Sequence, residues 1–173
     1  MLKIKPPNYK FCPFCGQKLV LKSDGERLRK HCSVCRWTYY PREGTSVGAV
    51  ILRGQKVLMV KRNREPYKGT WMFPAGYTEF GEHPEESLKR EVKEETGLKV
   101  TGGKLIKVFQ AVDDISAPGH FIFFYSVKVS GELKNGDPNE NQEVAWQDIN
   151  KLPKIGWKIH QKVAKMLFKT RRS

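Results

Sequence analysis

The stretch GYTEFGEHPEESLKREVKEETGL, residues 76–98, places seven glutamates in a basic chain, whose formal net charge is +14. Pro84 suits the first position of a helix, and Gly97 suits the residue just past its end. We therefore expect a helix over residues 84–96. The segment therefore predicts where this helix begins and ends. It also raises the question of what offsets the repulsion among its carboxylates.

The predicted helix has an acidic face. At 3.6 residues per turn, Glu91, Glu94 and Glu95 lie on one side of the helix. Lys89 and Lys93 lie on the opposite side, so they cannot neutralise the glutamates well. Like charges at this spacing destabilise a helix by about 0.2–0.5 kcal/mol per pair. Converging carboxylate oxygens are suitable ligands for a hard cation such as Mg²⁺ or Mn²⁺, and the alternative is a solvated acidic face.

The four cysteines form two pairs, CPFC and CSVC, at Cys12, Cys15, Cys32 and Cys35. This spacing is typical of a tetrahedral four-thiolate zinc site. Four thiolates leave no open position on the metal, so the zinc would be structural, and its binding would stabilise a segment too short to fold alone. Two disulfides are the alternative, and an intracellular location argues against them.

The rest of the chain alternates apolar strands with loops and one further helix. Apolar or alternating runs predict strands at 47–52, 56–62, 71–76, 99–112 and 120–129, and a strand or turn at 143–149. A polar loop covers 131–143, and apolar residues at helical spacing predict a second helix over 155–169. Strands interleaved with two helices indicate an α/β or α+β sandwich.

Length and charge limit the class of protein. A chain of 173 residues with 39% hydrophobic residues suffices for one ordinary domain and a small appendage. It has no run of 18 apolar residues and no signal-peptide pattern at its start, so we expect a cytoplasmic protein outside the membrane. Residues 1–42 and 150–173 each carry a net charge of +8, which leaves −2 for residues 43–149. Basic ends favour phosphate-bearing partners, and a Lys-rich surface for solubility explains them equally well.

The acidic stretch resembles the Nudix box. Gly76, Glu82 and the run REVKEETGL at 90–98 occupy every defined position of GX5EX7REUXEEXGU, in which U is an aliphatic residue. The chain is thus similar to the Nudix hydrolases. The resemblance implies a Nudix α/β/α sandwich with a mixed sheet at residues 43–173, preceded by a zinc ribbon at residues 1–42. It also implies metal-dependent hydrolysis of a small-molecule nucleoside diphosphate derivative.

The resemblance assigns roles within the box. It implies that Glu91 and Glu95 are the main carboxylate ligands of Mg²⁺ or Mn²⁺. Glu94 would contribute directly or through water, and the backbone carbonyl of Ala75 would join them. The bound metal would polarise the diphosphate and activate a water molecule.

Two further roles follow from the family. Glu82 would pair with Arg90 and hold the loop onto the helix. The general base varies among Nudix hydrolases and is often a glutamate outside the box. Glu143 is the first choice here and Glu140 the second, and either is alternatively a solvated loop acid.

The cysteine pattern narrows the subfamily. Its continuation into YYPR and then a Nudix domain resembles the NADH pyrophosphatases. Those enzymes follow the box with a Gln-Pro-Trp-Pro-Phe-Pro stretch, and the corresponding region here, KLIKVFQAVDDISAPGHF, has none. The run VKRNREPYKGTWMFPAGYTEFGE is closer to the zinc-ribbon FAD/ADP-ribose pyrophosphatases. The likeness, which extends from about residue 10 to about residue 130, implies ADP-ribose or FAD as substrate and AMP as product.

Other functions stay open. One is an NADH pyrophosphatase, and another is an RNA 5′-end (cap) hydrolase whose polynucleotide the basic ends would hold. A third is a nucleic-acid-binding or ligand-sensing regulatory module, against which the intact box argues. Trp71, Phe73 and Tyr77 are candidates for stacking on adenine, although core packing is the more frequent fate of such residues. The resemblance is compatible with a homodimer and leaves the oligomeric state open.

Overall fold

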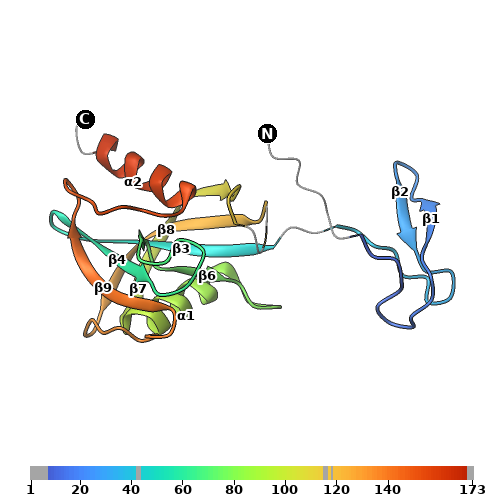
Figure 1. Ribbon diagram of the computed structural model, residues 1–173, viewed down its shortest axis with the longest axis horizontal. Helices are drawn as coiled ribbons and strands as arrows, with labels where there is room; N and C mark the ends of the chain where they lie inside the picture. The colour runs from blue at the N-terminus through green and yellow to red at the C-terminus, as the bar shows by residue number, and fades with distance from the viewer. Residues whose placement is uncertain (1–7, 42–43, 115–116, 118, 171–173) are drawn as a thin grey trace. The chain divides into compact units, whose positions relative to one another are not determined.

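Figure 1 presents the computed structural model, in which residues 8–41, 44–114, 117 and 119–170 are described. Residues 168–170 are described by their backbone alone. The chain divides into two compact units, Met1–Glu43 and Gly44–Ser173. The outermost residues of the predicted ribbon and of the predicted Nudix domain, 1–7 and 171–173, lie outside the described residues, as do 42 and 43. None of the helices within the described ranges has the length and apolar character needed to cross a membrane.

The first unit is a small hairpin with a cysteine cluster. Strand β1 (Val20–Ser23) pairs antiparallel with β2 (Leu28–His31). Its core consists of three buried side chains with one aromatic ring packed on them: Cys12, Leu19, Cys32 and Trp37. So few buried side chains cannot stabilise a fold, which is why a metal ion is the expected source of the missing free energy.

The second unit is an α/β/α sandwich built on a mixed sheet (Figure 1). Its strands are β3 (Thr45–Arg53), β4 (Lys56–Arg62), β5 (Trp71–Met72), β6 (Ala75–Tyr77), β7 (Lys99–Gln110), β8 (Phe121–Ser130) and β9 (Asn141–Asp148). Strand β3 lies at the centre. It pairs parallel with β8 along one edge, and antiparallel with β6 and then β4 along the other. Strand β7 continues the sheet beyond β8, and β4 also pairs with β5 and β9.

The two helices cover opposite faces of this sheet (Figure 1). Successive residues of a strand point to opposite faces, so β3 contributes to two cores. Val47 packs on the side of α1 (Pro84–Thr96), in a cluster that includes Leu88. Val50 packs on the side of α2 (Lys158–Thr170). A central strand buried on both faces explains the continuous apolar run VGAVIL.

Local signals place both ends of α1 where the sequence predicts them. The His83 side chain accepts a hydrogen bond from the backbone N–H of Glu85 at 3.3 Å, and the Glu86 carboxylate accepts one from the backbone N–H of His83 at 3.2 Å. At the other end Gly97 adopts a φ of 73° and donates its N–H to the carbonyl of Lys93. The two caps therefore fix where α1 begins and ends, and with it the position of the acidic face along the chain.

Three predicted boundaries are wrong. The strand predicted at 71–76 is split into β5 and β6, because the chain turns at Phe73 and Pro74. Strand β9 begins at Asn141, inside the predicted loop, since it pairs with β4. The second helix begins at Lys158 rather than 155, because Ile155 forms a parallel bridge with Trp71.

Candidate active site

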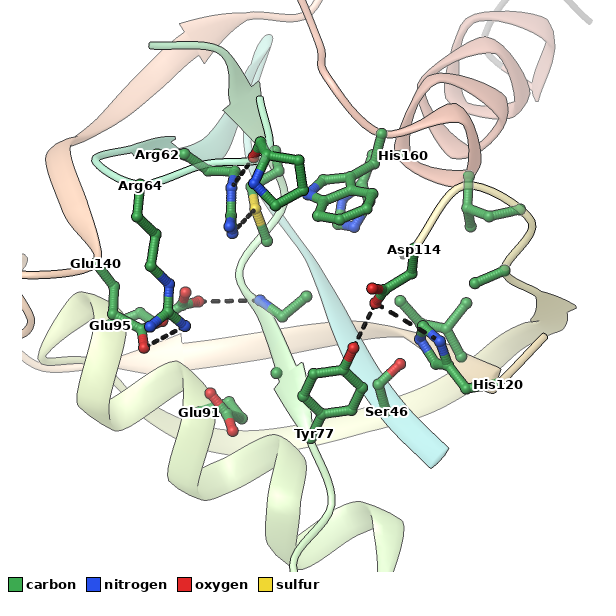
Figure 2. Close-up of a pocket in the computed structure, with 18 of the residues that line it drawn as sticks. Ser46, Arg62, Arg64, Tyr77, Glu91, Glu95, Asp114, His120, Glu140 and His160 are labelled. Carbon is green, nitrogen blue, oxygen red and sulfur yellow. Dashed lines mark hydrogen bonds and ion pairs between the residues drawn. The ribbon is translucent and has the colours of Figure 1, made fainter. Parts of the chain in front are cut away.

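A cavity of about 630 Å³ opens in the second unit (Figure 2). Its lining comes from β3, the end of β4, β6, α1, the segment after β7, the segment before β9, and the start of α2. The sheet and its helices thus bring together residues that lie far apart in the sequence. Three parts of the lining differ in chemistry: an acidic wall, a cationic wall and a polar corner.

The acidic wall comes from α1. The Glu95 side chain is 6% exposed, and its Oε2 accepts the backbone N–H of Ala75 at 2.9 Å. Burial, together with the charge of nearby Glu91, raises the pKa of Glu95 to about 8. Burial also raises the pKa of Glu91, whose side chain is 14% exposed. Two adjacent carboxylates in such a place are costly as anions unless a cation approaches them.

Gly76 makes room for one of these carboxylates. A Cβ atom at Gly76 would lie 2.1 Å from Cδ of Glu91, which is far inside van der Waals contact. The glycine of the motif is therefore required by a close approach between β6 and the Glu91 side chain.

Glu82 ties the loop before α1 to the helix. Its carboxylate accepts two hydrogen bonds from Arg90, at 3.0 Å from Nε and 2.9 Å from Nη2, and one from Ser87 Oγ at 2.6 Å. The Arg90 guanidinium, then Ser87 and the backbone N–H of Glu79, hold the pKa of Glu82 at about 2. A paired carboxylate of this kind stays ionised at neutral pH.

Arg90 also contacts groups other than Glu82. Its Nη1 lies 2.6 Å from Oε1 of Glu91 and 3.1 Å from Oε2 of Glu94, and its Nη2 donates to the backbone carbonyl of Tyr77 at 2.9 Å. The sequence prediction left the three glutamates of the helix without a protein cation. The structure supplies one, Arg90, which holds the carboxylates of Glu91 and Glu94 in place.

The cationic wall consists of Arg62 and Arg64, at the end of β4 and in the loop after it, and Figure 2 shows Arg64 beside Glu140. Arg62 is half-buried, donates from Nε to the carbonyl of Pro66 at 2.9 Å, and lies 5.4 Å from the ring centroid of Trp157. Burial, and then the charge of Arg64, lowers the pKa of Arg62. Within the described part of the chain, Arg62 makes no ion pair with a carboxylate, whereas Arg64 pairs with Glu140 at 2.5 Å. Arg62 is thus a partly desolvated cation that an anionic ligand would satisfy.

The polar corner lies beside β3. The Tyr77 hydroxyl donates to Asp114, and Nδ1 of His120 lies 3.7 Å from the same carboxylate (Figure 2). Ser46, on β3, is also part of this corner. His160 lines another part of the cavity, where its Nδ1 accepts the backbone N–H of Phe73 at 3.1 Å. Burial, and then Arg62, lowers the pKa of His160 to about 3, so the ring is neutral.

A separate cluster of sulfur atoms lies in the first unit. The Sγ atoms of its four members all lie within 4.8 Å of one another: Cys12, Cys15, Cys32 and Cys35. Sγ of Cys15 is 3.6 Å from Sγ of Cys32, which also accepts the backbone N–H of Cys35 at 3.3 Å. Thiolates held about 2.3 Å from a tetrahedral zinc lie about 3.8 Å apart. The donor set and its spacing fit such an ion.

The NUDIX domain family matches residues 42–167 of this chain, which is well over half of its length. The chain belongs to the Nudix family. Its α/β/α sandwich with a mixed sheet and its box helix α1 agree with that assignment.

Similar proteins extend the comparison. The ADP-ribose pyrophosphatase of Methanocaldococcus jannaschii is 34% identical over 160 residues, which cover 88% of this Nudix chain and 92% of that protein. The NAD-capped RNA hydrolase NudC of Vibrio vulnificus is 31% identical over 146 residues, and this chain spans only 53% of its length. The crystal structure of a MutT NUDIX hydrolase from Burkholderia pseudomallei superimposes with a TM-score of 0.67 at 25% identity, covering 72% of this chain and 97% of that one.

The Nudix fold gathers most of the predicted site residues. Five of them line the cavity: Ala75, Arg90, Glu91, Glu94 and Glu95. Glu82 supports Arg90 from outside the lining. Of the two candidate bases, Glu140 lines the cavity. Glu143 is exposed on β9, opposite Lys61, and is not among the lining residues.

The aromatic candidates separate in the same way. Trp71 and Phe73 are buried in the core on the α2 side, as the more frequent fate of such residues predicts. Tyr77 lines the cavity. Of these three residues, which are close in the sequence, two therefore belong to the core and one is placed to contact a ligand.

Sequence reasoning missed several lining residues: Ser46, Arg62, Arg64, Asp114, His120 and His160. They come from separate elements, and no local motif marks them. One signal was available, because His160 lies next to the apolar stripe of α2 at Ile159, and the structure buries this histidine to 4% exposure. A buried histidine on an apolar face indicates a specific hydrogen bond.

Proposed function

We propose that this Nudix protein hydrolyses the diphosphate of a nucleoside diphosphate derivative, with ADP-ribose or FAD as preferred substrate and AMP as a product. The observation that carries the proposal is the pair of carboxylates, buried Glu95 and half-buried Glu91, on the wall of a cavity that Arg62 also lines. A diphosphate bound between these walls would meet a cation on one side and a metal site on the other.

The carboxylates fit a hard divalent cation. Glu91, Glu94 and Glu95 offer oxygen ligands on consecutive turns of α1, and the carbonyl of Ala75 belongs to the strand that contacts Glu95. Mg²⁺ or Mn²⁺ bound there would polarise the diphosphate and lower the pKa of a bound water. The repulsion among these glutamates, which Arg90 offsets only in part, is thereby explained.

The chain itself would position the substrate. Arg62 and Arg64 would attract the phosphate oxygens, and the partial burial of Arg62 strengthens that attraction because water screens it less. Arg90 would stay on its glutamates, where its bidentate bond to Glu82 keeps the loop and helix in register. Water attack on one phosphorus then breaks the P–O–P bridge and gives two monophosphates.

We infer that Glu140 is a better candidate for the general base than Glu143. Glu140 lines the cavity and pairs with Arg64, whereas Glu143 is exposed on β9 and is not a lining residue. A base must reach the attacking water, directly or through one other water molecule. The salt bridge between Arg64 and Glu140 would hold the Glu140 carboxylate at the cavity.

The choice of ADP-ribose rests on two facts. The Methanocaldococcus jannaschii relative named ADP-ribose pyrophosphatase matches over 92% of its length, so the likeness includes the segment before the Nudix domain. The chain also lacks the Gln-Pro-Trp-Pro-Phe-Pro stretch expected of NADH pyrophosphatases. We further propose that the cysteine cluster holds one structural zinc, since four thiolates leave no open coordination position.

A panel assay tests the substrate. AMP release would be measured with ADP-ribose, FAD, NADH and NAD-capped RNA, each with Mg²⁺ and with Mn²⁺. We expect ADP-ribose or FAD to give the highest kcat/KM. A preference for NADH by more than about tenfold, roughly 1.4 kcal/mol of transition-state stabilisation, would contradict the proposal.

The second candidate is hydrolysis of NAD-capped RNA. The observation in its favour is the likeness to NudC proteins, such as that of Vibrio vulnificus, together with the net charge of +8 on residues 1–42. If RNA is the substrate, kcat/KM for capped RNA will exceed that for ADP-ribose and will fall steeply as salt is raised. ADP-ribose turnover will show a much weaker salt dependence.

A further inference from the structure

Ser46 is a buried polar residue that the proposed hydrolysis does not use. It lies near the start of β3 and is 4% exposed, and its Oγ has no hydrogen-bond partner among the described residues. Buried hydroxyl groups are normally satisfied, because leaving one without a partner destabilises the folded state. Ser46 lines the cavity, so a bound ligand would supply the missing partner.

The register of the sheet explains which residues surround Ser46. It is paired with Tyr77 of β6 on one side and with Ile122 of β8 on the other. Residues directly opposite one another in a sheet present their side chains on the same face. The three therefore form one row across three strands, and all three line the cavity. Figure 2 shows the Ser46 hydroxyl beside the Tyr77 ring.

The neighbours of this row are hydrogen-bonding groups with fixed roles. The Tyr77 hydroxyl donates to Asp114. His120 is 5% exposed, and its Nδ1 lies 2.8 Å from the carbonyl of Ala117. A carbonyl can only accept, so Nδ1 of His120 donates the hydrogen of this bond. Ser46, Tyr77, Asp114 and His120, here called the Ser46 corner, thus combine a carboxylate, two hydroxyl groups and an imidazole.

This chemistry selects among ligand groups. A phosphate would be repelled by the Asp114 carboxylate, and the arginines on the other wall suit it better. A flat nucleobase would find an aromatic ring at Trp157, which lines the cavity and contacts Tyr67 and Arg62. Sugar hydroxyl groups both donate and accept, as the Ser46 corner requires, and carboxylates commonly bind the hydroxyl groups of ribose.

We propose that the Ser46 corner binds the hydroxyl groups of the sugar on the non-adenosine half of the substrate. For ADP-ribose that half leaves as ribose 5-phosphate. The inference rests on the proposed function and adds the orientation of the substrate: the adenosine half lies toward Trp157, and the sugar of the second half lies toward Ser46.

Binding of the two product halves tests this orientation. Dissociation constants for ribose 5-phosphate and for AMP would be measured by NMR titration of the full chain with Mg²⁺. We expect Ser46→Ala to weaken ribose 5-phosphate binding by roughly threefold to tenfold, the effect of one lost hydrogen bond, and to leave AMP binding unchanged. Ser126→Ala is the matched control, because Ser126 lies on β8 and is not a lining residue. It should change neither constant.

A second comparison separates contact from misfolding. The unmodified chain should bind 2-deoxyribose 5-phosphate more weakly than ribose 5-phosphate, and Ser46→Ala should reduce this difference, since the two deletions remove parts of one interaction. Without ligand, the thermal midpoint of Ser46→Ala should be unchanged or higher, because the variant no longer buries an unpartnered hydroxyl. A role in folding alone would lower the midpoint instead.

Two results would overturn the assignment. One is weakened AMP binding with unchanged ribose 5-phosphate binding, which would place the adenosine half in the Ser46 corner. The other is an unchanged dissociation constant for ribose 5-phosphate. These measurements need no turnover, so they are independent of the panel assay. Absence of ADP-ribose hydrolysis would contradict the proposed function. The role of the Ser46 corner would still be decided by the dissociation constants of ribose 5-phosphate and AMP.

Discussion

At the scale of single residues, Glu95 is the sharpest test of the acidic wall. Glu95→Gln preserves the shape of the side chain and the hydrogen bond from Ala75, and it removes the negative charge. If Glu95 holds a catalytic cation, kcat for ADP-ribose should fall by about 100-fold or more, as for other groups that stabilise a charged transition state.

Glu85→Gln is the matched control for this change. Glu85 lies in the first turn of the same helix, is exposed, and is not a lining residue, so the control should keep kcat within about twofold. Near-parental activity in a folded Glu95→Gln variant would refute the metal-site interpretation of α1.

His160 gives a pH-dependent stability that the carboxylates do not explain. Its folded pKa of about 3 lies below the ordinary value of 6.5, because burial disfavours the charged ring. Below pH 6.5 the unfolded chain gains a proton that the folded chain cannot take up. His160 should therefore contribute a loss of about 2 kcal/mol in the free energy of unfolding between pH 7 and pH 5, while Glu95, whose pKa is raised, contributes in the opposite direction in parent and variant alike.

The measurement is denaturant unfolding of the parent and of His160→Asn at both pH values. The Asn side chain offers an oxygen to the N–H of Phe73 and does not titrate, so the variant should lose less stability than the parent at pH 5. Equal losses in the two proteins would mean that His160 is not the titrating group.

At the scale of elements, two glycines of the box segment should respond differently to alanine. Gly76→Ala places a methyl group against the Glu91 carboxylate, so we expect a loss of about 100-fold in kcat, typical of a catalytic group displaced by about 1 Å. Gly81 has a φ of 83° and open space around it, so Gly81→Ala should destabilise the fold by about 1 kcal/mol and leave kcat nearly unchanged. Thermal melts and turnover of both variants check the contrast, and a reversed pattern would contradict it.

Elements with local signals were predictable, and those set by distant partners were not. Both ends of α1 follow from residues within its own first and last turns, such as Pro84 and Gly97. The start of β9 follows instead from its pairing with β4, and Ile155 leaves the predicted helix because Trp71 binds it. The acidic wall lies on one helix and was visible in the sequence. The cationic wall comes from the end of β4 and the loop after it, and the Ser46 corner from two strands and the segment between β7 and β8, so no local sequence pattern marked either.

At the scale of the whole molecule, the two compact units should differ in what stabilises them. Purified protein should contain one zinc per chain by metal analysis. Cys12→Ser should unfold the first unit, because its core is too small to fold without the ion, and should affect turnover per folded molecule much less. Absence of zinc, or a thiol titration that indicates two disulfides, would contradict the prediction.

The parallel pairing of β3 with β8 has a consequence for how the chain folds. The register joins Thr45 to Phe121, so the ladder at the centre of the sheet closes a loop that contains β4, β6, α1 and β7. Contacts of such long sequence separation make folding slow, because the entropy of loop closure is lost before the contacts form. The acidic wall lies inside that loop. Activity should therefore return during refolding only together with the central ladder.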